Sequence, residues 1–91
     1  MEHTHTRFGK CVIADITQGQ LEKFSLAMKG VGDLPMTAFY GKSVRQAVAS
    51  GILTEPALTD EQVDAAKPSL IHWLANCLAE EINEASNIDP L

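Results

Sequence analysis

The chain of 91 residues is long enough for one domain, residues 1–91, and too short to bury a large core. Hydrophobic residues make up 45% of it, and no apolar run approaches the roughly 18 residues that a membrane-spanning helix needs. The two cysteines, Cys11 and Cys77, lie inside apolar patterns without the spacing of a disulfide framework, so we expect reduced thiols in a cytosolic protein.

The net charge of −5 is unevenly distributed along the chain. Residues 1–54 carry four acidic and six basic side chains, a balance of +2, whereas residues 55–91 carry eight acidic side chains and one lysine, a balance of −7. Direct nucleic-acid binding is not expected, because it needs several Lys and Arg side chains on the phosphates. The acidic half suits a basic protein partner, or the basic half of a second copy, or it is simply a solvated face.

A flexible tail and a strand are the first predicted elements. The tail, residues 1–6, contains His3 and His5, which offer a metal ion too few ligands, so no metal site is expected. Residues 7–15, RFGKCVIAD, are the best strand candidate. The apolar stretch 51–53 is too short to be a convincing partner, so this strand is expected to pair with another segment or with another copy of the chain.

A first helix is predicted over residues 17–29. It begins with a capping box, with Thr17 at the N-cap and Gln20 three residues later, and it ends at Gly30. Apolar side chains at helical spacing then form a stripe along one face.

A second helix is predicted after residue 35. Apolar side chains from position 36 onward recur at helical spacing, and Gly51 closes the segment. Gly41 makes an unbroken helix doubtful, so a helix that begins at Ser43, with Gln46 completing a capping box, is an open alternative.

The last two predicted helices meet at a proline. Thr59 and Gln62 form another capping box, and this helix is short because Pro68 blocks its continuation. Pro68 then serves as the first residue of a helix that runs to about Ala85. The predicted fold class is mainly α, or α+β with a minor N-terminal strand, built as a small bundle of three or four helices.

The segment PSLIHWLANCLAEEI, residues 68–82, places a Trp, a Cys and a His close together. At 100° per residue, Cys77 falls in the middle of the apolar face and His72 about 140° away, so the two cannot share a metal or a proton. We expect Cys77 to be a buried, inert thiol and His72 a surface residue, while Trp73 is either a core anchor or an interface hot spot. The other side chains on the side of His72 are Asn76, Ala79 and Asn83.

Two features of this last helix exceed what one core needs. Its apolar arc, from Trp73 round to Ala75, spans about 200°, which predicts contacts on two sides, as in a central helix or an oligomer. Glu81 falls inside that arc, and a buried carboxylate must be paired or neutralised. Either the core ends before this turn, or Glu81 meets a cation such as Arg45 or Lys42, within the chain or across an interface.

The C-terminal half of the chain resembles small proteins from the tail-assembly region of tailed phages and prophages. The shared phrases are an A-x-x-x-G turn, an acidic EPALT…VD helix start, a Pro-led helix containing W-L-A and a closing E-A-x-x-I-D/P-P, over residues 43–90. The matching positions are Ala47, Gly51, Glu55, Pro56, Ala57, Leu58, Thr59, Val63, Asp64, Pro68, Trp73, Leu74, Ala75, Glu84, Ala85, Ile88, Asp89 and Pro90.

The resemblance implies a non-catalytic tail-assembly chaperone in the cytoplasm of the host bacterium, a binder that keeps a long tape-measure helix or tail-tube subunits from aggregating. The acidic half keeps a second function open, a small acidic inhibitor of a host nucleic-acid enzyme of the anti-CRISPR or anti-restriction type. We expect neither a catalytic residue nor a cofactor. We do expect a homodimer. The predicted partner-binding residues are Trp73, Glu80, Glu81, Glu84 and Arg45.

Overall fold

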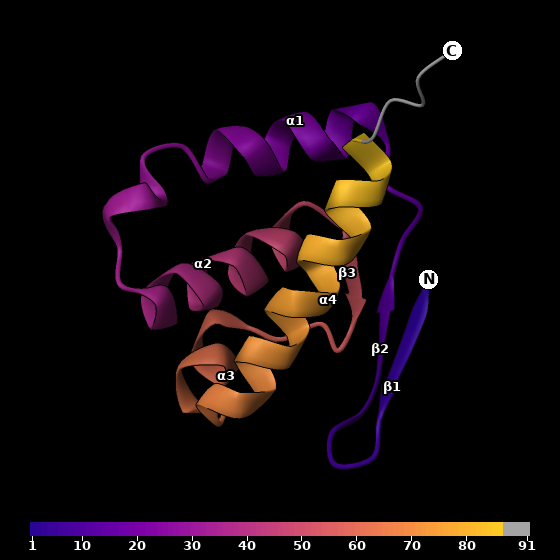
Figure 1. The fold of residues 1–91 in the computed structure, drawn as a ribbon, viewed down its shortest axis with the longest axis vertical. Helices are drawn as coiled ribbons and strands as arrows, with labels where there is room; N and C mark the ends of the chain where they lie inside the picture. Colours follow the sequence, from indigo (N-terminus) through magenta and orange to yellow (C-terminus); the bar gives the residue numbers. More distant parts are fainter. Residues whose placement is uncertain (87–91) are drawn as a thin grey trace.

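The computed structural model describes residues 1–86, which form four α-helices and a small antiparallel sheet (Figure 1). The protein is therefore mainly α with a minor β part, as predicted. No helix in these residues is long and apolar enough to cross a membrane. In chain order the elements are β1 (Glu2–His5), β2 (Gly9–Ile13), α1 (Gln18–Ala27), the 3-10 helix η1 (Val31–Asp33), α2 (Met36–Ala49), β3 (Leu53–Glu55), α3 (Asp60–Ala65) and α4 (Pro68–Ser86).

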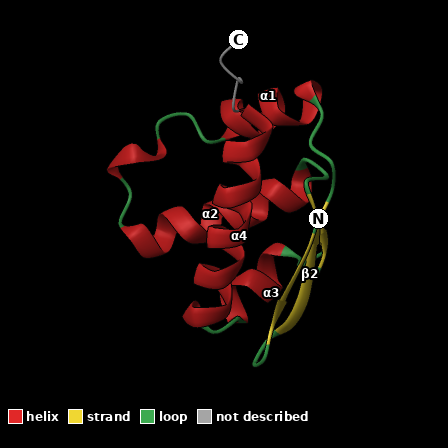
Figure 2. Ribbon diagram, turned by 45° about the vertical axis from the view of Figure 1, so that its right-hand side comes forward, coloured by secondary structure: helices red, strands yellow, loops and turns green. Residues whose placement is uncertain are grey.

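The sheet lies along one side of the helices in the order β1-β2-β3 (Figure 2). Two predictions for this region are wrong. The first residues are not a flexible tail, because β1 pairs antiparallel with β2 and places His3 opposite Cys11. The stretch around residues 51–53 is not too short to pair either, because β3 pairs with the other edge of β2 and places Leu53 opposite Ile13. Backbone hydrogen bonds supply both ladders, so short and polar strands can pair as long as one face is covered.

The β1-β2 hairpin closes through a short turn at residues 6–8. Gly9 follows this turn with φ of 86°, a left-handed conformation that glycine adopts without the steric cost of a Cβ. The backbone N–H of Arg7 donates a hydrogen bond to Nδ1 of His5 at 3.0 Å. These local contacts hold β1 in register with β2.

The predicted helix starts are confirmed at α1, α3 and α4. In α1, Thr17 Oγ1 accepts a hydrogen bond from Gln20 N at 3.2 Å, while Gln20 Oε1 accepts one from Thr17 N at 3.1 Å. The same reciprocal pair, between Thr59 and Gln62, begins α3. α4 begins at Pro68. Proline lacks a backbone N–H, but at the first position of a helix this group would have no intrahelical acceptor, so no hydrogen bond is lost.

The second helix is continuous, so the alternative start at Ser43 is wrong. α2 runs from Met36 through the buried Gly41 to Ala49. Ser43 does not cap a helix; its hydroxyl donates to the carbonyl oxygen of Phe39 one turn earlier, at 2.8 Å. Packing of both neighbouring turns against the rest of the protein offsets the low helix propensity of glycine.

The core lies between α4, α2 and the inner face of the sheet. α4 crosses in front of α2 and also packs against β2, so its wide apolar arc has two neighbours within one chain (Figure 1). The central-helix explanation of that arc is therefore confirmed. The largest fully buried side chains are Ile13, Ile52, Leu53, Leu74, Leu78, Val44 and Cys11.

Candidate partner-binding surfaces

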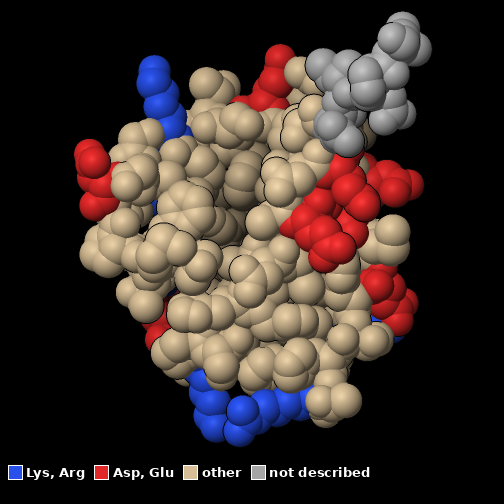
Figure 3. Space-filling model, in the orientation of Figure 1, with Lys and Arg blue, Asp and Glu red and all other residues tan. Residues whose placement is uncertain are grey.

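A groove of about 480 Å³ lies between α1, α2 and α4 and is open on one side. Figure 3 shows it as a hollow in the face of the molecule that α4 crosses. Its walls are mostly apolar, and side chains from all three helices build them. The walls include Phe24 and Met28 of α1, Phe39 and Tyr40 of α2, and Ala79 and Ile82 of α4.

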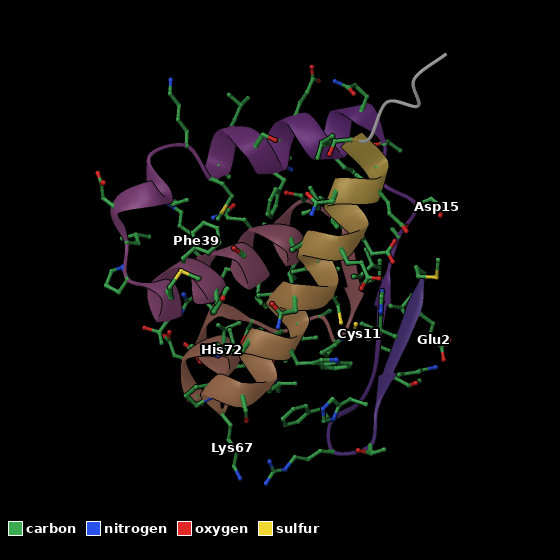
Figure 4. The ribbon with its side chains drawn as sticks, viewed as in Figure 1. Glu2, Cys11, Asp15, Phe39, Lys67 and His72 are labelled. Atoms are coloured by element: carbon green, nitrogen blue, oxygen red, sulfur yellow. The ribbon has the colours of Figure 1, made fainter. Side chains whose placement is uncertain are left out.

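The groove exists because α1 packs loosely and the facing walls carry small side chains. α1 contains no fully buried residue and contacts the rest of the protein mainly through α2. Opposite it, Ser43, Ala75 and Ala79 lack the volume to fill the space. Phe39 points from α2 towards α1 and closes only part of the gap (Figure 4). An apolar surface of this kind is typical of sites that bind another molecule.

Sequence reasoning missed the α4 wall of this groove. Asn76, Ala79 and Asn83 fall on the polar side of the helix and are exposed, yet they also form the α4 wall of the open groove. The periodicity of a single helix reveals its apolar face but not which third element approaches its polar face. No signal in α4 itself identifies α1 as that element.

Glu81 turns inward towards the hairpin. Its Oε1 atom lies 2.9 Å from Nε2 of His3, and the two side chains are only 13% and 19% exposed. Of the two alternatives for Glu81, pairing is the one observed, but the partner is His3 and not Arg45 or Lys42. The partner comes from the segment expected to be a tail, because the register of β1 places His3 on the same face of the sheet as Cys11.

Trp73 lies partly buried against the core and is covered by the hairpin. Its ring lies 5.3 Å from that of His5 and 5.9 Å from that of Phe8, while the His5 and Phe8 rings stack at 4.6 Å. The alternation of His3 and His5 is the sequence signal that could have identified β1, since period-two residues share one face of a strand.

Arg45 lies apart from the other predicted partner-binding residues. It extends from α2 to α3 and forms an ion pair with Asp64, beside a second pocket of about 310 Å³ between α2, α3 and α4. A Cβ atom at Gly41 would approach Arg45 Nη1 to 3.2 Å, so glycine leaves the guanidinium room across α2. Arg45 thus bridges α2 and α3 through an ion pair at the surface.

The remaining predicted residues share one stripe of α4. Glu80 and Glu84 follow Trp73 by seven and eleven residues, or about two and three helical turns, and both carboxylates are exposed. Within residues 1–86 neither of them takes part in an ion pair. Figure 3 shows acidic side chains gathered over the C-terminal half of α4. Glu80 neighbours the groove-lining Asn76 and Asn83, whereas Glu84 lines a separate pocket on the other side of α4 with Met1 and Asp15.

The two thiols lie at the contact between β2 and α4. Cys11 points inward from the sheet, and both cysteines are buried and reduced (Figure 4). Burial raises the pKa of Cys11 from 9.0 to about 12, with the neighbouring Cys77 thiol as a second cause. Burial also raises the pKa of Cys77. Both groups therefore stay protonated at neutral pH and are poor nucleophiles.

His72 is not the surface residue that was predicted. Its Nε2 atom is buried and has no hydrogen-bond partner among residues 1–86, and the ring of Tyr40 meets its ring edge-on with centroids 4.6 Å apart. α2 covers this part of α4 beyond the apolar arc, because the large Tyr40 side chain reaches across it. His72 is therefore held by aromatic packing.

A scan against protein-family models, a search of curated proteins and a search of solved structures found no match for this chain. The groove and the acidic side chains of α4 are therefore the structural features that bear on function.

Proposed function

We propose that this protein is a non-catalytic protein-binding factor, in the manner of a phage tail-assembly chaperone. The groove between α1, α2 and α4 is the observation that carries the proposal. An apolar surface hollowed between helices binds a hydrophobic segment of another chain and shields it from water. That is the activity a chaperone needs towards subunits that would otherwise aggregate.

In this proposal the helices act as a small bundle with one loosely held wall. α1 carries Leu26, which is 73% exposed, and none of its side chains is buried. Moving such a helix breaks few buried contacts, so the groove can widen at low cost when a partner enters. α2 and α4 pack firmly on each other and supply the rigid side of the site.

Co-expression tests the proposal directly. A tail-tube subunit or a tape-measure segment, produced with this protein, should show a several-fold larger soluble fraction and should be recovered with it in a pull-down. The same experiment with the exposed Ala65→Phe change, on α3, is expected to give the same result as the unchanged protein. Failure of every tail protein to be recovered, with no gain in solubility, would rule out the chaperone function.

The exposed acidic stripe favours a second candidate, an inhibitor of a host nucleic-acid enzyme. Glu80 and Glu84 could occupy a site that normally binds phosphate, because both are exposed and make no ion pair within residues 1–86. Reversing both charges should then abolish binding to a basic host nuclease complex. Unchanged binding after the reversal would count against this candidate.

A further inference from the structure

We infer that the groove takes one amphipathic helix of a partner protein, with its apolar side chains in the groove and a basic side chain against Glu80, beside the groove on α4. This inference deepens the proposed function and rests on it. The partner segment is a helix, its apolar face enters the groove, and its flanking charge is positive.

The shape of the groove fits a helix. All three of its walls are helices, and no strand edge lines it, so an extended segment would find no backbone ladder there. The small side chains Ala75 and Ala79 let another helix approach the backbone of α4 closely. An incoming helix would present apolar residues at positions i, i+3, i+4 and i+7 to Phe24, Phe39 and Ile82.

The charge beside the groove sets the sign of the partner. Glu80 is three or four residues from the groove-lining Asn83 and Asn76, so its side chain lies next to theirs on the surface of α4. Glu84, one turn further along, lies on the other side of α4, where it lines a separate pocket with Met1, Asp15 and Glu81. Figure 3 shows acidic side chains over the C-terminal half of α4, beside the hollow, whereas Lys and Arg lie at the lower edge and at the upper left of that view. A flanking Lys or Arg of the partner would meet the Glu80 carboxylate, which makes no ion pair within residues 1–86.

Two labelled peptides test this inference on the isolated protein. One is an amphipathic helix of about 18 residues with Leu on one face and Lys on the other, and the second has Glu at every Lys position. Fluorescence anisotropy should show binding of the basic peptide that weakens as salt is added, and no binding of the acidic peptide at the same concentrations.

Matched variants locate the binding. Ala79→Phe adds a neutral side chain inside the groove and should weaken binding of the basic peptide about tenfold or more, since the lost space must come from the bound helix. Its control is Ala65→Phe, an exposed alanine on α3 away from the groove, which should leave binding unchanged. Circular dichroism on each variant confirms that the fold is intact.

A second pair of variants tests the charge. Glu80→Lys should weaken binding of the basic peptide about three- to tenfold, because it removes one exposed ion pair and adds a like charge beside the groove. Glu84→Lys changes the net charge equally at an exposed position on the other side of α4 and should have little effect. An equal loss in both variants would mean attraction by net charge alone and would overturn the inference.

Other occupants give different results, and each of them would overturn it. Equal binding of the acidic peptide would show that the groove has no preference for a basic helix. Self-association that Ala79→Phe abolishes would identify a second copy as the occupant, and displacement of an apolar dye by small molecules but not by the peptide would identify a small ligand. Failure of both peptides, together with recovery of tail proteins by the Ala79→Phe variant, would place the partner elsewhere and leave the proposed function standing.

Discussion

At the scale of single residues, the buried thiols and Trp73 join the hairpin to α4. Cys11 lies on the face of β2 that packs on α4, and Trp73 lies under the rings of His5 and Phe8. Each of these side chains therefore reports on the same contact by a different measurement.

Thiol reactivity should be low in the folded protein. Cys11 is 0% exposed and Cys77 is 6% exposed, so reaction with an aromatic disulfide reagent should be slow under native conditions and complete after denaturation. The measurement is absorbance over time with and without denaturant. Rapid native labelling of either thiol would contradict the buried contact between β2 and α4.

Stability should fall as the pH rises above about 9. The unfolded chain releases the Cys11 proton near its ordinary pKa of 9.0, whereas the folded chain keeps the proton until its pKa of about 12. The folded state therefore binds more protons across this range, and the free energy of unfolding drops by up to about 1.4 kcal/mol per pH unit for each such thiol.

Urea denaturation between about pH 8 and about pH 11 measures this slope. Cys11→Ala should reduce the slope, even though the substitution itself lowers stability at every pH. Identical slopes in the two proteins would show that the thiol titrates normally.

Trp73→Ala should lower the free energy of unfolding by about 3 kcal/mol, because it removes a large side chain packed between the core and the hairpin. Urea denaturation gives the value, and Trp73→Phe, which keeps an aromatic ring beside His5, should cost less. A loss below about 0.5 kcal/mol, with partner binding abolished, would instead make Trp73 an interface residue.

At the scale of elements, α1 should be the least protected helix. It contains no buried residue, whereas α4 buries five, and the groove lies beneath it. Amide hydrogen exchange should therefore be at least about tenfold faster in α1 than in the middle of α4. Binding of a helix in the groove should slow exchange in α1, since the partner would cover its inner face. Equal protection of the two helices in the free protein would contradict a loosely held wall.

The elements that could be predicted from the sequence are those with local signals. The capping boxes at Thr17 and Thr59 and the proline at Pro68 mark helix starts through contacts within four residues. The face of α4 that contains Cys77 also follows from local periodicity.

The elements that were missed depend on distant segments. β1 is polar and short, and it is a strand because α4 covers its inner face and β2 pairs with its edge. The partner of Glu81 could not be found for the same reason, since His3 is 78 residues away. The groove likewise requires α1 to stand over α2 and α4, an arrangement that no stretch of sequence encodes locally.

At the scale of the whole molecule, a homodimer was predicted from a strand without a good partner in the chain, a two-sided last helix and halves of opposite charge, and only the third ground remains. β2 has both partners within the chain, and the wide arc of α4 is covered by α2 and the sheet. The opposite charges of the two halves remain, so association between copies should be weak and should decrease with salt. Sedimentation at low micromolar concentration in low and high salt measures it. A single species of about 10 kDa under both conditions would rule out the dimer.

The pairing of the hairpin with α4 also determines the order in which the fold can be completed. His3 and Glu81 join segments from opposite ends of the described chain, and the aromatic contacts of Trp73 do the same. During synthesis the hairpin leaves the ribosome before α4, so the inner face of the sheet, with Cys11 and Ile13, is not covered by α4 until that helix has been made. Closing so long a loop is entropically costly, and folding should be slower than for a bundle of the same size with only local contacts. The sheet would thus expose apolar surface during synthesis until α4 packs against it.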